Sequence, residues 1–186
     1  MTGRWSTSLF NHDNRGVSEV VGFIILFGFL IIALAGYQVE IVPQQNSEVE
    51  FQHLQEVRND LIEVRSSIST AGQSNMSQYQ TVTLGTSYPS RLFTLNPPAP
   101  AGTLRTSKTY NITIQNASNT ANIETRFLEY QPRYNEIEAN TIRYEHSVLY
   151  VDARDNGGGV AVLEDQNIDR GGGQVRINAI QNDFSA

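Results

Sequence analysis

The stretch VVGFIILFGFLIIALAGY, Val20–Tyr37, holds 18 residues without a charge. As an α-helix it would be about 27 Å long, close to the hydrocarbon thickness of a bilayer. A secretory signal peptide has a shorter apolar core that ends in a small-residue cleavage site, and the residues after Tyr37 contain no such site. The run therefore predicts a membrane-spanning helix that occupies residues 17–39 with its flanks.

The charges around this run predict its orientation. Arg4 and Arg15 precede it, whereas Glu40, Glu48 and Glu50 follow it. Short basic flanks stay in the cytoplasm, so we expect a single-pass cell-membrane protein with a cytoplasmic N-terminus and an extracellular C-terminal part. That part is acidic in a chain of net charge −6, which argues against nucleic acid as a partner. The chain has no cysteine, which excludes disulfides, thiolate metal sites and a lipid-modified cysteine anchor.

The segment that leads into the apolar run is Arg15-Gly16-Val17-Ser18-Glu19-Val20-Val21-Gly22. It resembles the class III signal sequence of archaeal type IV pilins and pilin-like proteins, which a membrane-embedded prepilin peptidase cuts after a small residue preceded by a base. The resemblance implies that residues 1–16 are a leader and that the cut falls between Gly16 and Val17. The apolar helix would then survive in the mature protein.

Physical chemistry is compatible with these roles. Gly16 offers no side chain to obstruct a protease, and Arg15 can hold the bond at the cytoplasmic interface. Glu19 near the helix start is favoured by the helix dipole. In the resembling filaments an early acid meets the N-terminal amine of a neighbour, but Glu19 would be the third mature residue instead of the fifth familiar from bacterial pilins. The alternative is that Arg15 and Glu19 merely flank an uncleaved signal anchor.

Residues 40–77 predict a linker followed by an amphipathic helix. Pro43 and the polar residues up to Ser47 interrupt the apolar pattern, and Asn46 or Ser47 would cap a new helix. That helix would run to about Ala71, before Gly72. One face carries a stripe at spacings of three and four, namely Leu54, Val57, Leu61, Val64 and Ile68. The stripe would pack on a following sheet or form a seam against another subunit.

Residues 78–186 predict an extracellular β-rich domain, because the periodicity changes to two. The candidate strands are residues 81–84, 91–95, 110–114, 123–130, 142–151, 160–163 and 175–180, separated by clusters of Gly, Pro and Asn. We therefore expect an α+β fold with a mainly antiparallel, β-sandwich-like domain. Residues 84–91, 95–98, 128–135 and 144–150 are also similar to an uncharacterised family of haloarchaeal surface proteins, a resemblance that brings no activity with it.

The polar and aromatic residues form no recognisable catalytic or metal-binding motif. His12, His53 and His146 are far apart in the sequence, and no ligand pair has metal spacing. Asp152, Asp155 and Asn156 before three glycines are better explained as a solvated turn than as a calcium loop, since the EF-hand order is missing. No nucleophile elbow or phosphate-binding loop occurs, so we predict neither an enzyme nor a cofactor. Strand-associated tyrosines are expected in the core and not as a sugar platform: Tyr130, Tyr134, Tyr144 and Tyr150.

Three N-x-S/T sequons lie on the predicted extracellular side, so Asn75, Asn111 and Asn116 are candidate N-glycosylation sites. Together the patterns predict a pilin-like cell-surface structural or adhesion protein, assembled into filaments with other subunits through its N-terminal helix. The alternative is a membrane-tethered extracellular β-domain that acts as a binding module without polymerising.

Overall fold

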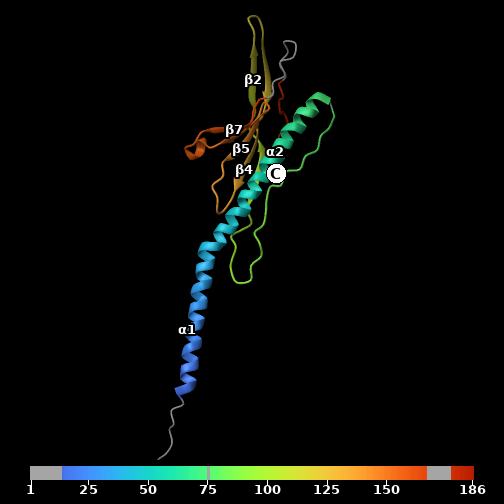
Figure 1. Ribbon diagram of the computed structural model, residues 1–186. Helices are drawn as coiled ribbons and strands as arrows, with labels where there is room; N and C mark the ends of the chain where they lie inside the picture. Colours follow the sequence, from blue (N-terminus) through green and yellow to red (C-terminus); the bar gives the residue numbers. More distant parts are fainter. Residues whose placement is uncertain (1–13, 75, 167–176) are drawn as a thin grey trace, which may run out of the picture.

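The computed structural model describes residues 14–74, 76–166 and 177–186 (Figure 1). One helical rod is formed by α1 (Asn14–Gly36), the π-helix η1 (Tyr37–Ile41) and α2 (Val42–Ser74). α1 projects away from the other elements, while α2 lies beside the strands (Figure 1). The rest of the regular structure within the described residues is antiparallel strands and one short 3-10 helix, η2 (Arg154–Asn156), which confirms the expected α+β class.

The helix does not stop at Pro43, contrary to the linker expected there. Proline lacks an N–H group and its ring crowds the carbonyl four residues earlier, which here belongs to Val39. That carbonyl lies in the π turn, where hydrogen bonds span five residues and Val42 N–H bonds to Tyr37 O. The wider turn absorbs the α-helical bond that proline cannot make, so the chain passes from α1 to α2 without a break. Gly72 also fails to end the helix, which continues to Ser74.

Seven strands follow α2 in the part of the chain that the structure describes. They are β1 (Ala101–Thr106), β2 (Tyr110–Gln115), β3 (Thr120–Thr125), β4 (Leu128–Arg133), β5 (Thr141–Glu145), β6 (Val148–Asp152) and β7 (Val160–Glu164). Five of them form one sheet in the order β1-β4-β5-β6-β7, and β2 pairs with β3 in a separate two-stranded sheet. The β2–β3 hairpin is an insertion between the paired strands β1 and β4. The chain end covers the outer edge of β1, where Leu104 and Ala186 exchange two backbone hydrogen bonds of 2.8 and 3.0 Å.

The expected strands are partly right. Residues 110–114 and 160–163 fall in β2 and β7. Residues 81–84 and 91–95 form no strand, whereas β1 begins in a segment that we expected to be a turn. Residues 123–130 divide between β3 and β4, where the chain leaves the hairpin for the main sheet. Most of residues 175–180 has no assigned strand among the described positions, and residues 175 and 176 lie outside them.

Residues 142–151 form two strands and not one, because a tight turn separates β5 from β6. His146 and Ser147 have φ of 49° and 73°, and a type I′ turn requires positive φ at both central positions. Such turns usually contain Asn-Gly, Asp-Gly or Gly-Gly, and His146-Ser147 lacks this signature, which explains why the sequence did not predict the turn. Arg65 Nε of α2 donates a hydrogen bond of 2.7 Å to Ser147 O and so holds the turn against the helix.

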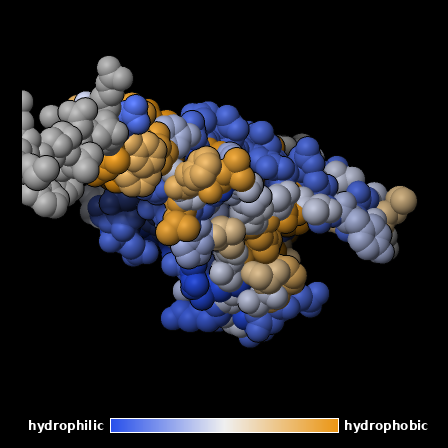
Figure 2. Space-filling model, turned by 90° about the horizontal axis from the view of Figure 1, so that it is seen from below, coloured by the Kyte–Doolittle hydropathy of each residue, from blue (hydrophilic) through white to orange (hydrophobic). Residues whose placement is uncertain are grey.

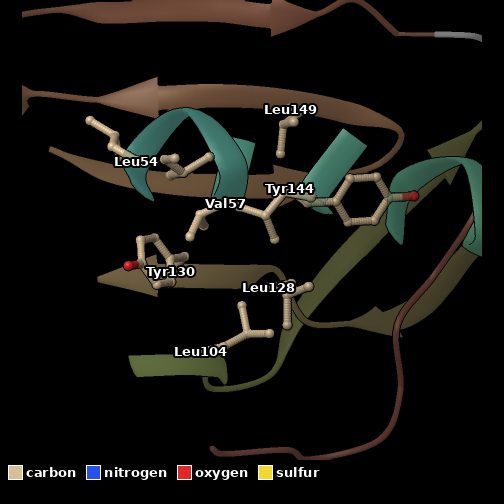
Figure 3. Packing of buried hydrophobic residues seen from close by; sticks show 9 residues of the cluster. Leu54, Val57, Leu104, Leu128, Tyr130, Tyr144 and Leu149 are labelled. Atoms are coloured by element: carbon tan, nitrogen blue, oxygen red, sulfur yellow. The ribbon is translucent and has the colours of Figure 1, made fainter. Parts of the chain in front are cut away.

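The core lies between α2 and one face of the five-stranded sheet (Figure 3). Leu54, Val57 and Leu61 of the predicted stripe are buried there, and Val64 and Ile68 pack against its margin. The sheet contributes Leu104, Leu128, Tyr130, Ile142, Tyr144 and Leu149. The stripe is therefore a core face, and the layer on this side of the sheet is a helix where a sandwich would have a second sheet.

Candidate functional site: the exposed apolar helix and its surroundings

The surface of residues 17–37, which we call the anchor surface, is apolar on all sides from Val20 onward and is mostly exposed. Phe23, Leu26 and Ile32 are 67, 69 and 68% exposed. A helix that is hydrophobic all round belongs in a membrane or among other helices. The rod is long and apolar enough near the N-terminus to cross a membrane, and its apolar window has no residue buried inside the protein.

Small residues interrupt the anchor surface. A Cβ added at Gly22, Gly28 or Gly36 would meet no atom within 4 Å, so these glycines have no packing role within the described chain. In lipid, where no hydrophobic force drives helices together, small residues allow helix backbones to approach closely. The open glycines thus lie where neighbouring helices could contact the anchor surface.

The predicted cleavage point lies at the very start of α1. Gly16 and Val17 are the third and fourth residues of the helix, and Val17 is 64% exposed. The first turn has N–H groups without helical partners, and helix ends fray, so this bond can adopt the extended form that a protease needs. Glu19 lies beyond the first turn of the helix that begins at Asn14, so the expected dipole interaction requires removal of the leader.

A loop lies beside the upper end of the anchor surface. The side-chain amide of Gln38 donates to Leu95 O at 3.0 Å and accepts from Leu95 N at 3.2 Å. Phe93 and Leu95 line a shallow hollow together with Ile31 and Leu34 of α1. The apolar loop tip, defined as Leu92, Phe93 and Leu95, is 93, 81 and 85% exposed.

Polar residues close the neck of this loop. Arg91 donates to Asn46 Oδ1 and Gln45 Oε1 of α2 at 3.1 and 2.9 Å. It also donates to Asn96 Oδ1, and Asn96 Nδ2 donates to Pro89 O at 2.8 Å. The neck is therefore fixed to the helix above the point where the tip reaches it. The strand predicted at residues 91–95 is therefore wrong, because alternating side chains do not distinguish a strand from a loop that is held by a distant helix.

Buried polar side chains of α2 fasten further loops to the rod. Glu50 is fully buried and accepts hydrogen bonds from the backbone N–H groups of Asn135, Glu136 and Ile137 at 2.7, 2.9 and 2.9 Å. Glu50 also accepts from the hydroxyl of Tyr88, whose pKa is raised to about 12 by burial and by this carboxylate. Tyr88 is therefore a donor at any physiological pH.

The histidines have structural positions or lie outside the described residues. His53 of α2 is buried within hydrogen-bond distance of Tyr134 Oη at 2.8 Å and Thr83 O at 2.9 Å. His146 lies in the β5–β6 turn, and His12 is outside the described residues. Within residues 14–74, 76–166 and 177–186, no three His, Asp or Glu side chains are grouped to hold a metal ion.

The sheet face opposite α2 carries a row of charges that the sequence analysis missed. Glu129 bridges Arg105 and Arg143 at 2.7 and 3.3 Å, and Asp152 pairs with Arg143 and Arg154. Hydrogen bonds from Arg154, with the charge of Arg143, hold the pKa of Asp152 well below its usual range. Asp152 is 4% exposed, so the solvated turn expected from Asp152 to Asn156 is wrong at its first residue. The sequence signal for this row is weak, because charged residues alternate with other residues in β5, at Arg143 and Glu145, whereas β6 contains one charged residue, Asp152.

The tyrosines behave largely as expected. Tyr130 and Tyr144 are buried in the core, at 0 and 2% exposed. Tyr134 is half-buried beside His53, and burial raises its pKa. Tyr150 lies on the opposite face and donates to Glu145 Oε2 at 3.2 Å. They do not form a common platform for a sugar.

Two of the three sequons are described. Asn111 is exposed on β2 of the hairpin, and Asn116 is exposed in the turn that joins β2 to β3. Asn116 Oδ1 accepts from the N–H groups of Ser118 and Asn119 at 2.9 and 2.7 Å, an arrangement typical of an Asx turn. Both amides are open to modification, while Asn75 lies outside the described residues.

The geometry defines a protein with one uncovered apolar helix that continues into an α+β head. Comparison with known sequences finds similarity to an uncharacterised protein of the archaeon Archaeoglobus fulgidus, with 25% identity over 146 residues. The match covers 74% of this chain but 25% of that protein, so the chain corresponds to about a quarter of its relative's length. No protein-family model matches the chain. No solved structure matches it either.

Proposed function

We propose that this protein is a non-enzymatic, pilin-like subunit of the archaeal cell surface, processed by a prepilin peptidase and assembled through its N-terminal helix. The proposal rests on one observation, which is that a single helical rod combines two features. An apolar helix with no buried residue in its apolar window begins at Asn14, directly before Arg15 and Gly16, and the same helical rod continues into the head as its packing element. A secretory signal would be discarded and would have no reason to be continuous with the core.

The arrangement supports a route from membrane to filament. Before assembly the anchor surface is in lipid, with the leader in the cytoplasm and the head outside. After cleavage at Gly16, anchors of several subunits pack together, and the glycines of the anchor surface let their backbones approach. The partners are then the membrane, the peptidase and other pilin-like subunits. The exposed Asn111 and Asn116 are on the displayed head, in positions open to glycan addition.

The test is the mass of the mature protein produced with a prepilin peptidase in an archaeal host. We expect a chain that begins at Val17. Gly16→Phe should retain the leader, because the bulky side chain blocks the peptidase. Gly22→Phe is the matched control, since a side chain there meets no atom of the described protein and lies away from the cut. Wild-type protein that begins at Met1 or Thr2 would refute the proposal.

One observation favours the tethered binding module as a second candidate. The loop tip borders the anchor surface near Ile31 and Leu34, which reduces the area that neighbouring anchors can reach. Shearing of intact cells separates the two candidates. Filament subunits are released as high-mass material, whereas a tethered module stays with the membrane and is released only by detergent as a monomer.

A further inference from the structure

We propose that the apolar loop tip, Leu92, Phe93 and Leu95, inserts into the outer leaflet of the bilayer that α1 spans and forms a second, shallow membrane contact. The inference needs the helix to span a membrane and goes beyond filament assembly. It begins with exposure, since three large apolar side chains at one loop tip are more than four-fifths exposed. Contiguous exposed apolar groups of this kind mark interaction sites.

The position of the tip identifies lipid as its occupant. Phe93 and Leu95 line one open hollow with Ile31, Leu34 and Ala35, so the tip borders the anchor surface. Ile31 precedes Tyr37, the end of the apolar run, by six residues, which corresponds to about 9 Å along the helix. Amphipathic segments at a bilayer surface bury their apolar side by about 5–10 Å. If α1 spans the membrane, the tip reaches the same depth.

The polar neck agrees with this depth. The side chains of Arg91, Gln45 and Asn46 interact further along the rod, on the side of the head. Asn46 follows Gln38 by eight residues, or about 12 Å of helix, which places the neck above the hydrocarbon boundary. The loop thus changes from polar to apolar along the helix axis, as a bilayer requires. Contact with a second subunit would not demand that gradient.

Hydrogen bonds make the insertion part of the fold. The paired bonds between Gln38 and the backbone of Leu95 hold the tip at one height on the helix. Viewed from the end at which α1 projects, hydrophobic residues gather in the centre of the molecule with hydrophilic residues beside them (Figure 2). The tip therefore does not need to refold in order to meet lipid.

The absence of cysteine allows a direct test with one fluorophore in the full chain. The probe is a polarity-sensitive dye on Phe93→Cys or Leu95→Cys, in phosphatidylcholine nanodiscs that hold one subunit each. Tyr79→Cys, at a position 92% exposed, is the control for water, and Ile24→Cys is the control for the span. Two quenchers of the dye fluorescence are compared. Iodide acts from the water, and a nitroxide attached to the lipid acyl chain near the headgroup acts from within the bilayer.

We expect iodide to quench the Phe93 and Leu95 labels about fivefold less than the Tyr79 label, because burial below the headgroups excludes the hydrated ion. The lipid nitroxide should quench both labels. Replacing Gln38 with Ala in the same background should raise iodide quenching at the tip, since the paired hydrogen bonds are lost. The tip residues are exposed, so the substitutions leave the core intact.

Three outcomes would overturn the inference. Iodide quenching at both tip positions equal to that at Tyr79 means that the tip lies in water. Protection from iodide and from the lipid nitroxide means that protein covers the tip. Iodide quenching of the Ile24 label equal to that of the Tyr79 label means that the helix does not span the bilayer, which would refute the proposed function as well. In the first two cases cleavage after Gly16 can still occur, so the failure of the loop inference is distinguishable from that of the proposed function.

Discussion

Glu50 offers the sharpest test of how the head is joined to the rod. Its carboxylate lies on α2 at 0% exposed and accepts four hydrogen bonds from residues 38 to 87 positions away in the sequence. Glu50→Gln keeps the shape of the side chain but replaces one acceptor oxygen with an NH₂ donor. We expect this single change to loosen the segments around Tyr88 and residues 135–137 from the helix.

The magnitude follows from the geometry. Oε2 receives two backbone N–H groups, while Oε1 receives Asn135 N–H and the Tyr88 hydroxyl, which can rotate and accept a bond from the new NH₂ group. The cheaper orientation of the amide therefore leaves one backbone N–H without a partner, at about 1–3 kcal/mol. The two remaining N–H bonds also lose their charge assistance, about 1 kcal/mol each. The free energy of unfolding should fall by about 3–5 kcal/mol. This lowers the melting temperature by about 6–20 °C for a chain of this size.

Thermal unfolding of the full chain in detergent, followed by near-ultraviolet circular dichroism, measures the effect. Glu48→Gln is the matched control, because Glu48 is exposed on the same helix and its change should stay within about 0.5 kcal/mol. A melting temperature for Glu50→Gln within about 2 °C of the wild type would show that the buried carboxylate does not hold the head to the rod.

Gly102→Ala should destabilise the head by at least about 2 kcal/mol, because the ring of Tyr130 occupies the place of the added methyl group. Urea unfolding measures this loss of stability, and an unchanged midpoint would contradict the packing of Gly102 against Tyr130. Asp152→Asn should lower stability by about 2 kcal/mol at neutral pH, since the carboxylate loses its arginine partners. The folded-state pKa of Asp152 is depressed, so its contribution is complete above the unfolded value of about 3.9 and fades as the pH falls below it. Unfolding midpoints of variant and wild type should therefore converge below about pH 4, and a constant gap would refute the assignment. Gly28→Leu should leave membrane insertion unchanged, because a side chain there meets no atom of the described chain. It should reduce the amount of high-mass material sheared from cells. Recovery of as much high-mass material as from the wild type would mean that Gly28 lies outside any subunit contact.

The sequence predicted those parts of the molecule that depend on local patterns. The uncharged run at Val20–Tyr37 and the stripe led by Leu54 and Val57 each carry their own periodicity, and the structure contains both helices. It did not predict that the two helices would be continuous, because proline normally interrupts a helix. A π turn at Tyr37–Ile41 allows the helix to continue through Pro43. The residue types of this turn do not predict it.

The errors in the head have a common cause, which is dependence on distant partners. β1 has weak strand residues and exists because β4 and the chain end pair with its two edges. The 91–96 loop has the alternation of a strand but is held by Gln38 and Asn46 of the helix. Such long-range hydrogen bonds leave no local signature, so the loop tip beside the anchor could be found only in the folded molecule.

The uninterrupted rod also has a mechanical consequence. Each residue of an α-helix turns the chain by 100° and advances it by 1.5 Å, so the azimuth of the head around the axis of α1 is set by the number of residues between them. The π turn at Tyr37–Ile41 contributes to that angle, and removal of one residue there would swing the loop tip by about 100° to another side of the anchor. A pulling force or a torque on the head is therefore transmitted through the hydrogen bonds of one continuous helix to the surroundings of the anchor surface. No flexible linker between α1 and α2 absorbs it.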